Sequence, residues 1–203
     1  LEGSIAHATM LGRCGIIKEE EANDIVKGLK GILADIENGT LHIDMEAEDI
    51  HTFIEGELTK RIGDNGKRLH TSRSRNDQVA VDIKLYLKKE VVNVKNLVVG
   101  LIKVIADKAE KYSETVMPGY THLQRAQPIT FGHHLLAYGE MLLRDVSRLE
   151  DCLKRMDEMP LGSCALAGTT YPIDRTITAE LLGFDRITKN SLDGVSDRDY
   201  CIE

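Results

Sequence analysis

Two long apolar stripes dominate the sequence and limit the folds that it can adopt. In the first stripe, Val79–Ala109, apolar side chains recur every three or four residues without a break, and Phe131–Met156 repeats the pattern. This spacing predicts amphipathic helices over about Asp77–Lys111 and from Pro128, a first-turn proline, to about Met159. The first helix would be on the order of 50 Å long. Two such helices need partners along their whole length, which predicts an all-α fold containing a helix bundle.

Shorter segments surround these two helices. The same periodicity, with acidic residues at starts and glycine at ends, predicts further helices at Ser4–Gly15, Glu19–Asn38, Ile50–Ile62 and Thr176–Leu182. We interpret Met117–Gln127 and Lys189–Asp197 as loops. The one domain boundary that we expect lies near Leu69, so that residues 1–69 are part of an N-terminal helical domain and residues 70–203 part of a long-helix bundle.

Composition excludes several classes of protein. Hydrophobic residues make up 42% and charged residues 29% of the chain, which argues against disorder. The net charge of −7 argues against binding to nucleic acid or an anionic membrane. No apolar run approaches the roughly 20 residues of a membrane span. The four cysteines form no CxxC pair, so we expect free thiols, no metal site and a cytoplasmic location.

Residues 70–78, ahead of the first long helix, are rich in hydrogen-bond donors. Ser74, Arg75 and Asn76 stand where free backbone N–H groups and the helix dipole favour an anion. A guanidinium also suits a carboxylate. The alternative is that Asn76 or Asp77 only caps the helix and that the arginines are solvated. A cap needs one such residue and not a run of donors, so the sequence favours an anion site.

Two further loops precede helices. In residues 119–128, His122 has polar neighbours and could act as a general acid or base near neutral pH. On spacing alone, a histidine bonded to a loop carbonyl explains it better. Residues 160–170, rich in Gly and Ala, allow close backbone approach or form a tight corner between helices.

These loops resemble, in their order along the chain and in their residues, those of the fumarase/aspartase superfamily. Within it, residues 71–78 (TSRSRNDQ), 119–128 (GYTHLQRAQP) and 190–199 (NSLDGVSDRD) resemble the argininosuccinate lyase family. The resemblance covers the whole chain. The Thr-His loop is shared by several members of the superfamily, whereas the SRNDQ run is much more specific and decides against adenylosuccinate lyase and fumarase.

The resemblance implies an all-α homotetramer in which each active site is assembled from three subunits. The implied reaction is the reversible β-elimination of argininosuccinate to arginine and fumarate, in arginine biosynthesis or urea formation, with no cofactor and no metal. His122, together with Thr121, matches the catalytic positions. The implied substrate-binding residues are Ser74, Arg75, Asn76, His51, Thr121 and Gln124.

The chemistry gives these residue types a reason. Removing the weakly acidic proton next to a carboxylate creates an enolate-like dianion, which fixed donors and cations stabilise by a few kcal/mol each. The family's mobile loop, whose serine is usually assigned the proton abstraction, does not occur in residues 1–203, so we expect this chain alone to be inactive. Cys164 stands where we expect glycine or another small residue.

Three alternatives remain open. The protein could be another enzyme of the same superfamily. It could be a structural protein like the lens crystallins related to argininosuccinate lyase. A plain helical oligomerisation module would explain the apolar stripes but not the donor-rich loops.

Overall fold

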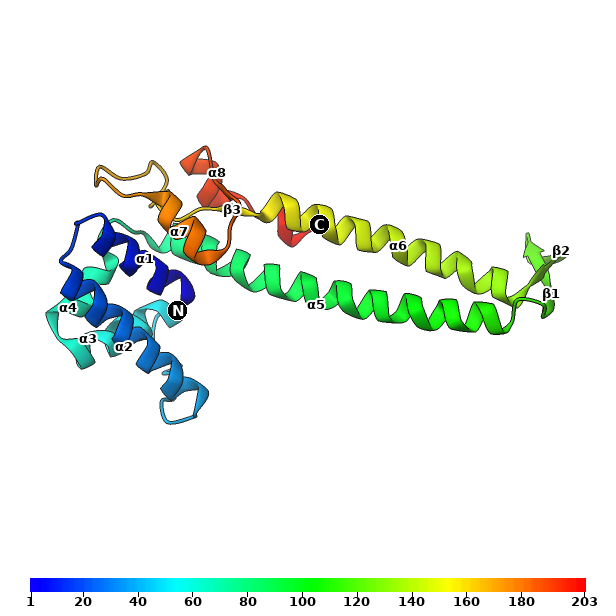
Figure 1. Cartoon of the computed structure of the whole chain (residues 1–203), viewed down its shortest axis with the longest axis horizontal. Coiled ribbons are helices and arrows are strands. Elements are labelled where there is room, and N and C mark those ends of the chain that lie inside the picture. The colour runs from blue at the N-terminus through cyan, green and yellow to red at the C-terminus, as the bar shows by residue number, and fades with distance from the viewer. The chain divides into compact units, whose positions relative to one another are not determined.

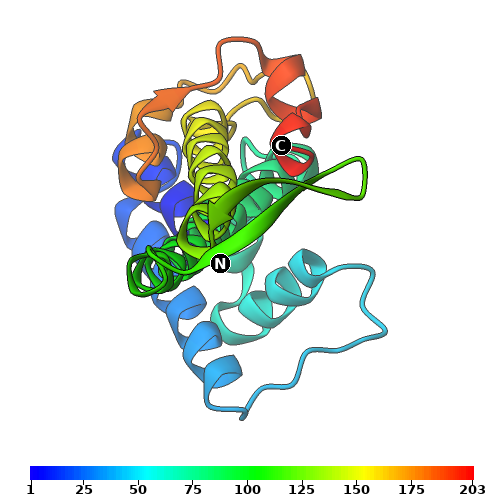
Figure 2. The same cartoon turned by 90° about the vertical axis from the view of Figure 1, so that its right-hand side faces the viewer.

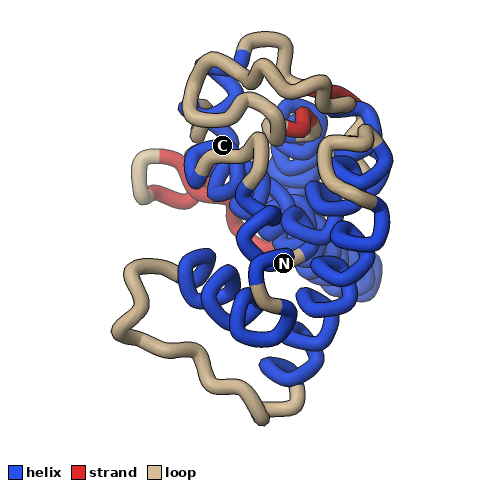
Figure 3. The backbone as a smooth tube through the Cα atoms, turned by 90° about the vertical axis from the view of Figure 1, so that its left-hand side faces the viewer, coloured by secondary structure: helices blue, strands red, loops and turns tan.

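The computed structural model describes residues 1–203 and is mainly helical (Figures 1 and 3), which confirms the predicted all-α fold class. The larger helices are α1 (Glu2–Arg13), α2 (Glu19–Glu37), α3 (Ile50–Ile62), α5 (Arg75–Lys111), α6 (Phe131–Met156) and α7 (Arg175–Leu182). Short helical turns are α4 (Asp64–Lys67), η1 (Arg68–His70), α8 (Ser191–Ser196) and η2 (Asp199–Cys201). The strands are β1 (Val116–Thr121), β2 (Gln124–Thr130), β3 (Glu158–Met159) and β4 (Arg186–Ile187). None of the helices is both long and apolar enough to cross a membrane.

The chain divides into two compact units. Unit 1 comprises Leu1–Leu85 and Asp157–Arg198, and unit 2 comprises Tyr86–Met156 and Asp199–Glu203. The boundary predicted near Leu69 concerns the domains of a whole protein, and it stays a prediction.

Unit 1 holds the apolar core of the chain. Helices α1, α2 and α3 pack together around fully buried side chains such as Leu11, Leu29 and Leu58. Gly28 allows α2 and α3 to approach closely, because a Cβ there would lie 2.6 Å from Leu58 Cδ1. A second cluster, formed by Val81, Met159, Leu161, Ala179 and Phe184, joins the start of α5 to the segment 159–184. Unit 1 therefore fixes the loops around the start of α5 from several sides.

Unit 2 is a pair of antiparallel helices, the part of α5 after Leu85 and α6, joined by a hairpin of β1 and β2 (Figures 1 and 2). The helices approach closely at Gly132, where a Cβ would lie 2.4 Å from the carbonyl oxygen of Ala109. Further along, Lys95 Nζ lies 3.5 Å from Glu150 Oε1.

The structure corrects three sequence predictions. Met117–Gln127 is not a loop, because most of it lies in the β1–β2 hairpin, and Pro128 pairs with Pro118 instead of opening a helix. Proline is tolerated there because each strand of a two-stranded sheet is an edge strand. The second long helix ends at Met156 instead of Met159. The predicted loop Lys189–Asp197 contains α8, whose first amides donate to the side chain of Asn190.

The other helix predictions are confirmed to within a few residues. The segment 38–49 between α2 and α3 is a loop, drawn in tan in Figure 3. It ends at Asp49, whose carboxylate accepts from the Thr52 amide at 2.6 Å and so caps α3.

Candidate functional site

The donor-rich segment predicted ahead of the first long helix forms the first turn of α5 in unit 1. The Ser74 hydroxyl accepts a hydrogen bond from the backbone N–H of Asn76 at 3.3 Å. The Asn76 side-chain amide donates to the carbonyl oxygen of Ala165 at 2.9 Å. Ser72 Oγ donates to Thr169 Oγ1 at 3.1 Å. The segment 71–76 is thus bound along its length to the loop 162–169, and Ser74 and Asn76 are held side by side.

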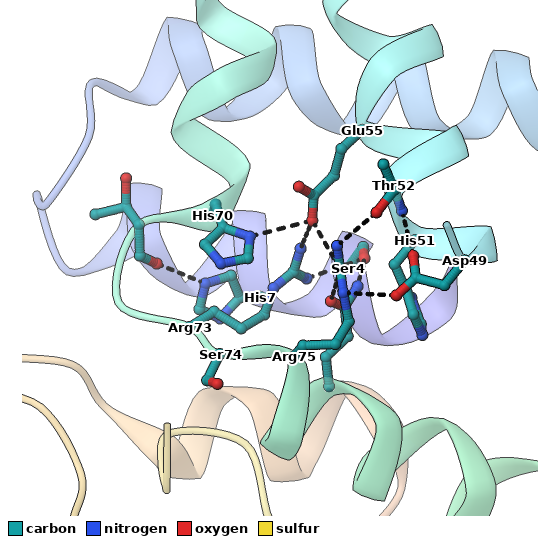
Figure 4. Close-up of polar contacts among 12 residues, drawn as sticks. Ser4, His7, Asp49, His51, Thr52, Glu55, His70, Arg73, Ser74 and Arg75 are labelled. Atoms are coloured by element: carbon teal, nitrogen blue, oxygen red, sulfur yellow. Dashed lines mark hydrogen bonds and ion pairs between the residues drawn. The ribbon is translucent and has the colours of Figure 1, made fainter. Parts of the chain in front are cut away.

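Arg75 has a different environment from the one that its position in the sequence suggested. Its Nε lies 3.0 Å from Asp49 Oδ2, and its Nη1 lies 3.2 Å from Glu55 Oε1 (Figure 4). The same nitrogen donates to Gln78 Oε1 at 2.6 Å. Two carboxylates therefore already neutralise the guanidinium, and Arg75 ties α5 to the start of α3.

Glu55 is the centre of this cluster, and no sequence pattern singles it out. Its Oε1 lies within 3.3 Å of nitrogens from His70, Arg73 and Arg75. Burial works against ionisation, but the His70 hydrogen bond and the neighbouring positive charges hold the pKa of Glu55 below its ordinary value. Only the crowding of arginine and histidine in residues 68–75 could have suggested a carboxylate partner.

Arg73, a member of this cluster, and the neighbouring His7 are both buried. The Arg73 guanidinium is fully buried and donates to Ser4 Oγ at 3.0 Å as well as to Glu55. His7 Nε2 lies 2.9 Å from the Thr71 carbonyl oxygen, so this nitrogen carries the proton and donates it. Burial, assisted by the charge of Arg73, lowers the pKa of His7 to about 3. His7 is therefore a neutral structural donor that holds the loop at Thr71.

His51, predicted to lie near the substrate, sits beside Asp82. Its Nδ1 is 3.8 Å from Asp82 Oδ2. Burial lowers the pKa of His51 below its ordinary value, and the opposing charge of Asp82 does not cancel this effect. Together with Glu55 and Gln78, these two side chains supply polar walls to an otherwise largely apolar pocket of about 260 Å³.

Asp77 is fully buried in the first turn of α5. Its carboxylate accepts from the backbone N–H groups of Ser74, Gly162 and Cys164 at 2.8–3.0 Å. Burial raises the pKa of Asp77 above its ordinary value, although these hydrogen bonds act in the opposite direction. In the sequence, Asp77 stands out only as a candidate helix cap.

The other predicted site residues lie in unit 2, at the turn of the β1–β2 hairpin. Thr121 pairs with Gln124, and the two residues between them, His122 and Leu123, have φ values of 51° and 60°. Hairpins favour such two-residue turns, but Asn and Gly usually occupy them. The His122 side chain is exposed and makes no hydrogen bond within the chain. A hydrogen bond to a loop carbonyl, the alternative role for this histidine, is therefore absent.

Two groups of predicted residues result. Ser74, Asn76, Arg75 and His51 are in unit 1, whereas Thr121, His122 and Gln124 are in unit 2. The first group follows the pattern of an anion site at a helix N-terminus, with Ser74 and Asn76 as side-chain donors. The second group offers an imidazole whose orientation no contact within the chain fixes. The roles of all seven residues stay predictions.

The chain matches the model of a family described as "Lyase" over residues 2–203. It is 61% identical to argininosuccinate lyases of Desulforamulus reducens and Heliobacterium mobile, over 100% of the chain and 44% of each relative. It is 59% identical to argininosuccinate lyases of Acinetobacter baumannii, of which it covers 43%. The chain thus spans less than half the length of these relatives.

Solved structures with the same fold come from proteins that are also longer. A variant of EDDS lyase with bound fumarate superposes with a TM-score of 0.87 at 33% identity, over 98% of this chain and 39% of the other. EDDS lyase in complex with formate gives the same values. A fumarate lyase:delta crystallin from Brucella melitensis, bound to cobalt, has a TM-score of 0.79 at 21% identity, covers 98% of this chain and 48% of that one, and shares the fold.

Proposed function

Because the chain belongs to the lyase family whose model matches residues 2–203, we propose that the whole protein is an argininosuccinate lyase. It would catalyse the reversible β-elimination of argininosuccinate to arginine and fumarate. The relatives of that name are 59–61% identical across the full length of this chain. A bound fumarate in a structural neighbour of 33% identity supports the same class of product.

The observation that carries the proposal is the pair of donors at the start of α5. Ser74 and Asn76 are fixed side by side at a helix N-terminus, against the loop 162–169. Elimination removes a proton from the carbon next to a carboxylate, and negative charge accumulates on that carboxylate before the C–N bond breaks. Donors that are already in place stabilise this charge without reorganising. The geometry of Ser74 and Asn76 suits that task.

We assign His122 the transfer of a proton to or from the reacting groups, with Thr121 and Gln124 as binding residues beside it. As the C–N bond breaks, its electron pair leaves with the guanidinium nitrogen, which takes up a proton, and the carbanion electron pair forms the double bond of fumarate. We expect the residue that first removes the carbon-bound proton to lie outside residues 1–203.

We further propose that the active sites form in a homotetramer, with contributions from three subunits. Helix α5 has 37 residues and a length of about 55 Å, and it separates Asn76 from Thr121 along the chain. Apolar side chains on α5 such as Leu97 and Leu101 are 75% and 50% exposed, as expected of a surface covered by other subunits. All four cysteines are free, which fits the proposed cytoplasmic location.

Arg75 and His51 receive modified roles in this proposal. Since Asp49 and Glu55 already neutralise Arg75, we assign it to the support of the binding loop and not to direct charge pairing with substrate. His51 borders the pocket beside Asp82 and would contact substrate as a neutral imidazole.

The test is fumarate release by the full-length protein, offered argininosuccinate and adenylosuccinate in parallel. Fumarate from argininosuccinate alone supports the proposal. Fumarate from adenylosuccinate would point to another enzyme of the superfamily, and fumarate from neither would favour a structural role. The isolated 203-residue chain is expected to release none, so turnover by this chain would contradict the assignment of the missing base.

A further inference from the structure

The buried carboxylate of Asp77 has no part in the chemistry proposed above, yet it joins two segments that are far apart in the sequence. Its Oδ1 accepts from Ser74 N at 3.0 Å. Its Oδ2 accepts from Gly162 N at 3.0 Å and from Cys164 N at 2.8 Å. The side chain is completely shielded from solvent, so it cannot touch a substrate itself.

The loop 162–164 is shaped around this carboxylate. Gly162 and Cys164 both have positive φ, 88° and 53°, and their N–H groups converge on one oxygen. Successive backbone N–H groups in such conformations form concave sites that bind anions. A Cβ on Gly162 would lie 2.7 Å from Ile173 Cδ1, so the packing around the loop leaves no room for a side chain at position 162.

The same loop orients Asn76. The residue after Cys164 is Ala165, whose carbonyl oxygen accepts the hydrogen bond from the Asn76 side-chain amide at 2.9 Å. On the other side of the carboxylate, Asp77 holds the backbone of Ser74, whose hydroxyl accepts from the Asn76 backbone N–H. Both proposed substrate donors thus depend on groups that Asp77 fixes.

We infer that Asp77 is a positioning residue for substrate binding, which couples the loop 162–165 to the first turn of α5 and so sets the orientations of Ser74 and Asn76. This inference rests on the proposed function. A carboxylate is required because its two oxygens accept hydrogen bonds from three backbone N–H donors. Asparagine has one acceptor oxygen, and its NH₂ group would face a donor on one side or the other.

The experiment uses the full-length protein and the variant Asp77→Asn, with fumarate binding measured by calorimetry and kcat and KM measured with argininosuccinate. The variant loses the hydrogen bonds of Asp77 either to Ser74 or to the loop 162–164. We therefore expect fumarate to bind about tenfold more weakly, a change of about 1.4 kcal/mol, and KM to rise with it. Ile32→Val, in the core of α2, is the control. It should lower the melting temperature without changing fumarate affinity.

Amide hydrogen exchange separates positioning from general destabilisation. The N–H groups of Gly162 and Cys164 should exchange faster in Asp77→Asn and not in Ile32→Val. Fumarate affinity within twofold of wild type in Asp77→Asn would overturn the inference. A wild-type protein that releases no fumarate overturns the proposed function instead, and fumarate binding by calorimetry then decides the inference alone.

A second variant covers the case in which Asp77→Asn does not fold. Thr169→Val removes the hydrogen bonds that Thr169 Oγ1 accepts from Ser72 Oγ and from the Tyr171 backbone N–H, at the far end of the same loop. Thr169 is only partly buried, so the variant should fold. We expect fumarate affinity to fall by about threefold, because the Ser72–Thr169 bond is only one of the hydrogen bonds that join this loop to residues 71–76. Unchanged affinity in Thr169→Val would overturn the coupling between this loop and the binding residues.

Discussion

The two units of the chain differ in how far their apolar side chains are exposed to solvent. Unit 1 has a core of enclosed apolar side chains, in which Leu29, Ile32 and Leu58 have no exposed surface. In unit 2, Leu97 is 75% exposed and Val104 is 54% exposed, on a helix whose apolar periodicity is as regular as any in the chain. Contacts within unit 1 are sufficient to specify its core, whereas the exposed stripe of unit 2 is the surface that the proposed homotetramer would cover.

The polar groups differ in the same way. In unit 1, Glu55 forms ion pairs with Arg73 and Arg75, and Asp77 accepts hydrogen bonds from two separate segments. The proposed binding residues are therefore held in place before any substrate binds. In unit 2, His122 stands exposed on a hairpin turn without a hydrogen-bond partner in its own chain. Under the proposed function, unit 1 would supply preorganised binding residues, and unit 2 would supply His122, a catalytic group that the proposed assembly orients, with Thr121 and Gln124 beside it.

The largest effect expected from this division concerns activity. In the full-length protein, His122→Asn should lower kcat by about 10²–10⁴-fold, the usual contribution of a general acid or base, and leave fumarate affinity nearly unchanged. Asn76→Ala should instead weaken fumarate binding, because it removes a donor from the binding site. Steady-state kinetics and calorimetry measure the two effects separately.

The exposed His42 supplies the control, since it lies in the loop before α3 and outside the proposed site. His42→Asn should match wild type in both measurements. If His122→Asn weakened fumarate binding as much as Asn76→Ala does, the assignment of binding to Asn76 and of proton transfer to His122 would be wrong.

The second test compares the two kinds of apolar residue. Leu29→Ala should lower the free energy of unfolding by about 2–5 kcal/mol, because it opens a cavity in the core of unit 1, and the oligomeric state should not change. Leu97→Lys should cause little loss within a folded chain but should dissociate the full-length assembly. Denaturant titration and sedimentation velocity are the measurements. A Leu97→Lys variant that keeps its assembly would show that the stripe has another use.

The helices of both units could be predicted from sequence because helix formation follows a local period. The boundaries of α1, α2, α3, α5 and α7 agree with the apolar spacing to within a few residues. The hairpin could not be predicted, because its turn uses His122 and Leu123 in place of the glycine or asparagine that usually mark positive φ. Local pattern therefore failed where two residues adopt a conformation that their side chains disfavour.

The site was only half predictable for a related reason. A cluster of donors at a helix start is visible in sequence, and so Ser74 and Asn76 could be proposed as anion-binding residues. Their supports come from distant segments. Glu55 lies 20 residues before Arg75, and the Gly162 amide comes from 85 residues after Asp77. Such pairings depend on tertiary contacts, which the period of a single helix does not encode.

The third prediction uses the buried polar groups of unit 1. With a folded-state pKa of about 3 and an ordinary value of 6.5, His7 stays neutral in the folded protein while the unfolded chain takes up a proton. The contribution of His7 to the free energy of unfolding is therefore fully present above pH 6.5. It decreases as the pH falls toward 3, by about 1.4 kcal/mol per pH unit well inside this window. Denaturant titrations between pH 7 and 5 should show the loss.

The matched variant is His7→Gln, which can still donate to the Thr71 carbonyl oxygen but does not titrate. It should lose stability less steeply with falling pH than wild type, whereas Ile32→Val should be destabilised equally at every pH. An unchanged slope in His7→Gln would mean that His7 is not the buried neutral group that the structure describes.

The smallest expected effect concerns backbone strain, which both units contain. In unit 1, Cys164 has a φ of 53°, a conformation that costs most residues about 1–2 kcal/mol and glycine almost nothing. Glycine loses more chain entropy on folding, and the hydrogen bond from Cys164 Sγ to the Ser72 carbonyl oxygen would be lost. We therefore expect Cys164→Gly to stabilise the protein by only about 0.5 kcal/mol in denaturant titration.

Leu123→Gly, at the hairpin turn of unit 2, is the matching variant, and its effect on stability can be compared with that of Cys164→Gly in unit 1. Leu123 has a φ of 60° and is 98% exposed, so within one chain glycine relieves strain and removes no packing. If strain alone mattered, Leu123→Gly and Cys164→Gly would both be stabilising. We expect the two variants to differ in sign in the full-length protein, because in the proposed homotetramer the exposed Leu123 side chain would pack against another subunit and glycine would lose that contact. Equal stabilisation would show that the hairpin turn, unlike the helix stripe beneath it, stays free of contacts in the assembly.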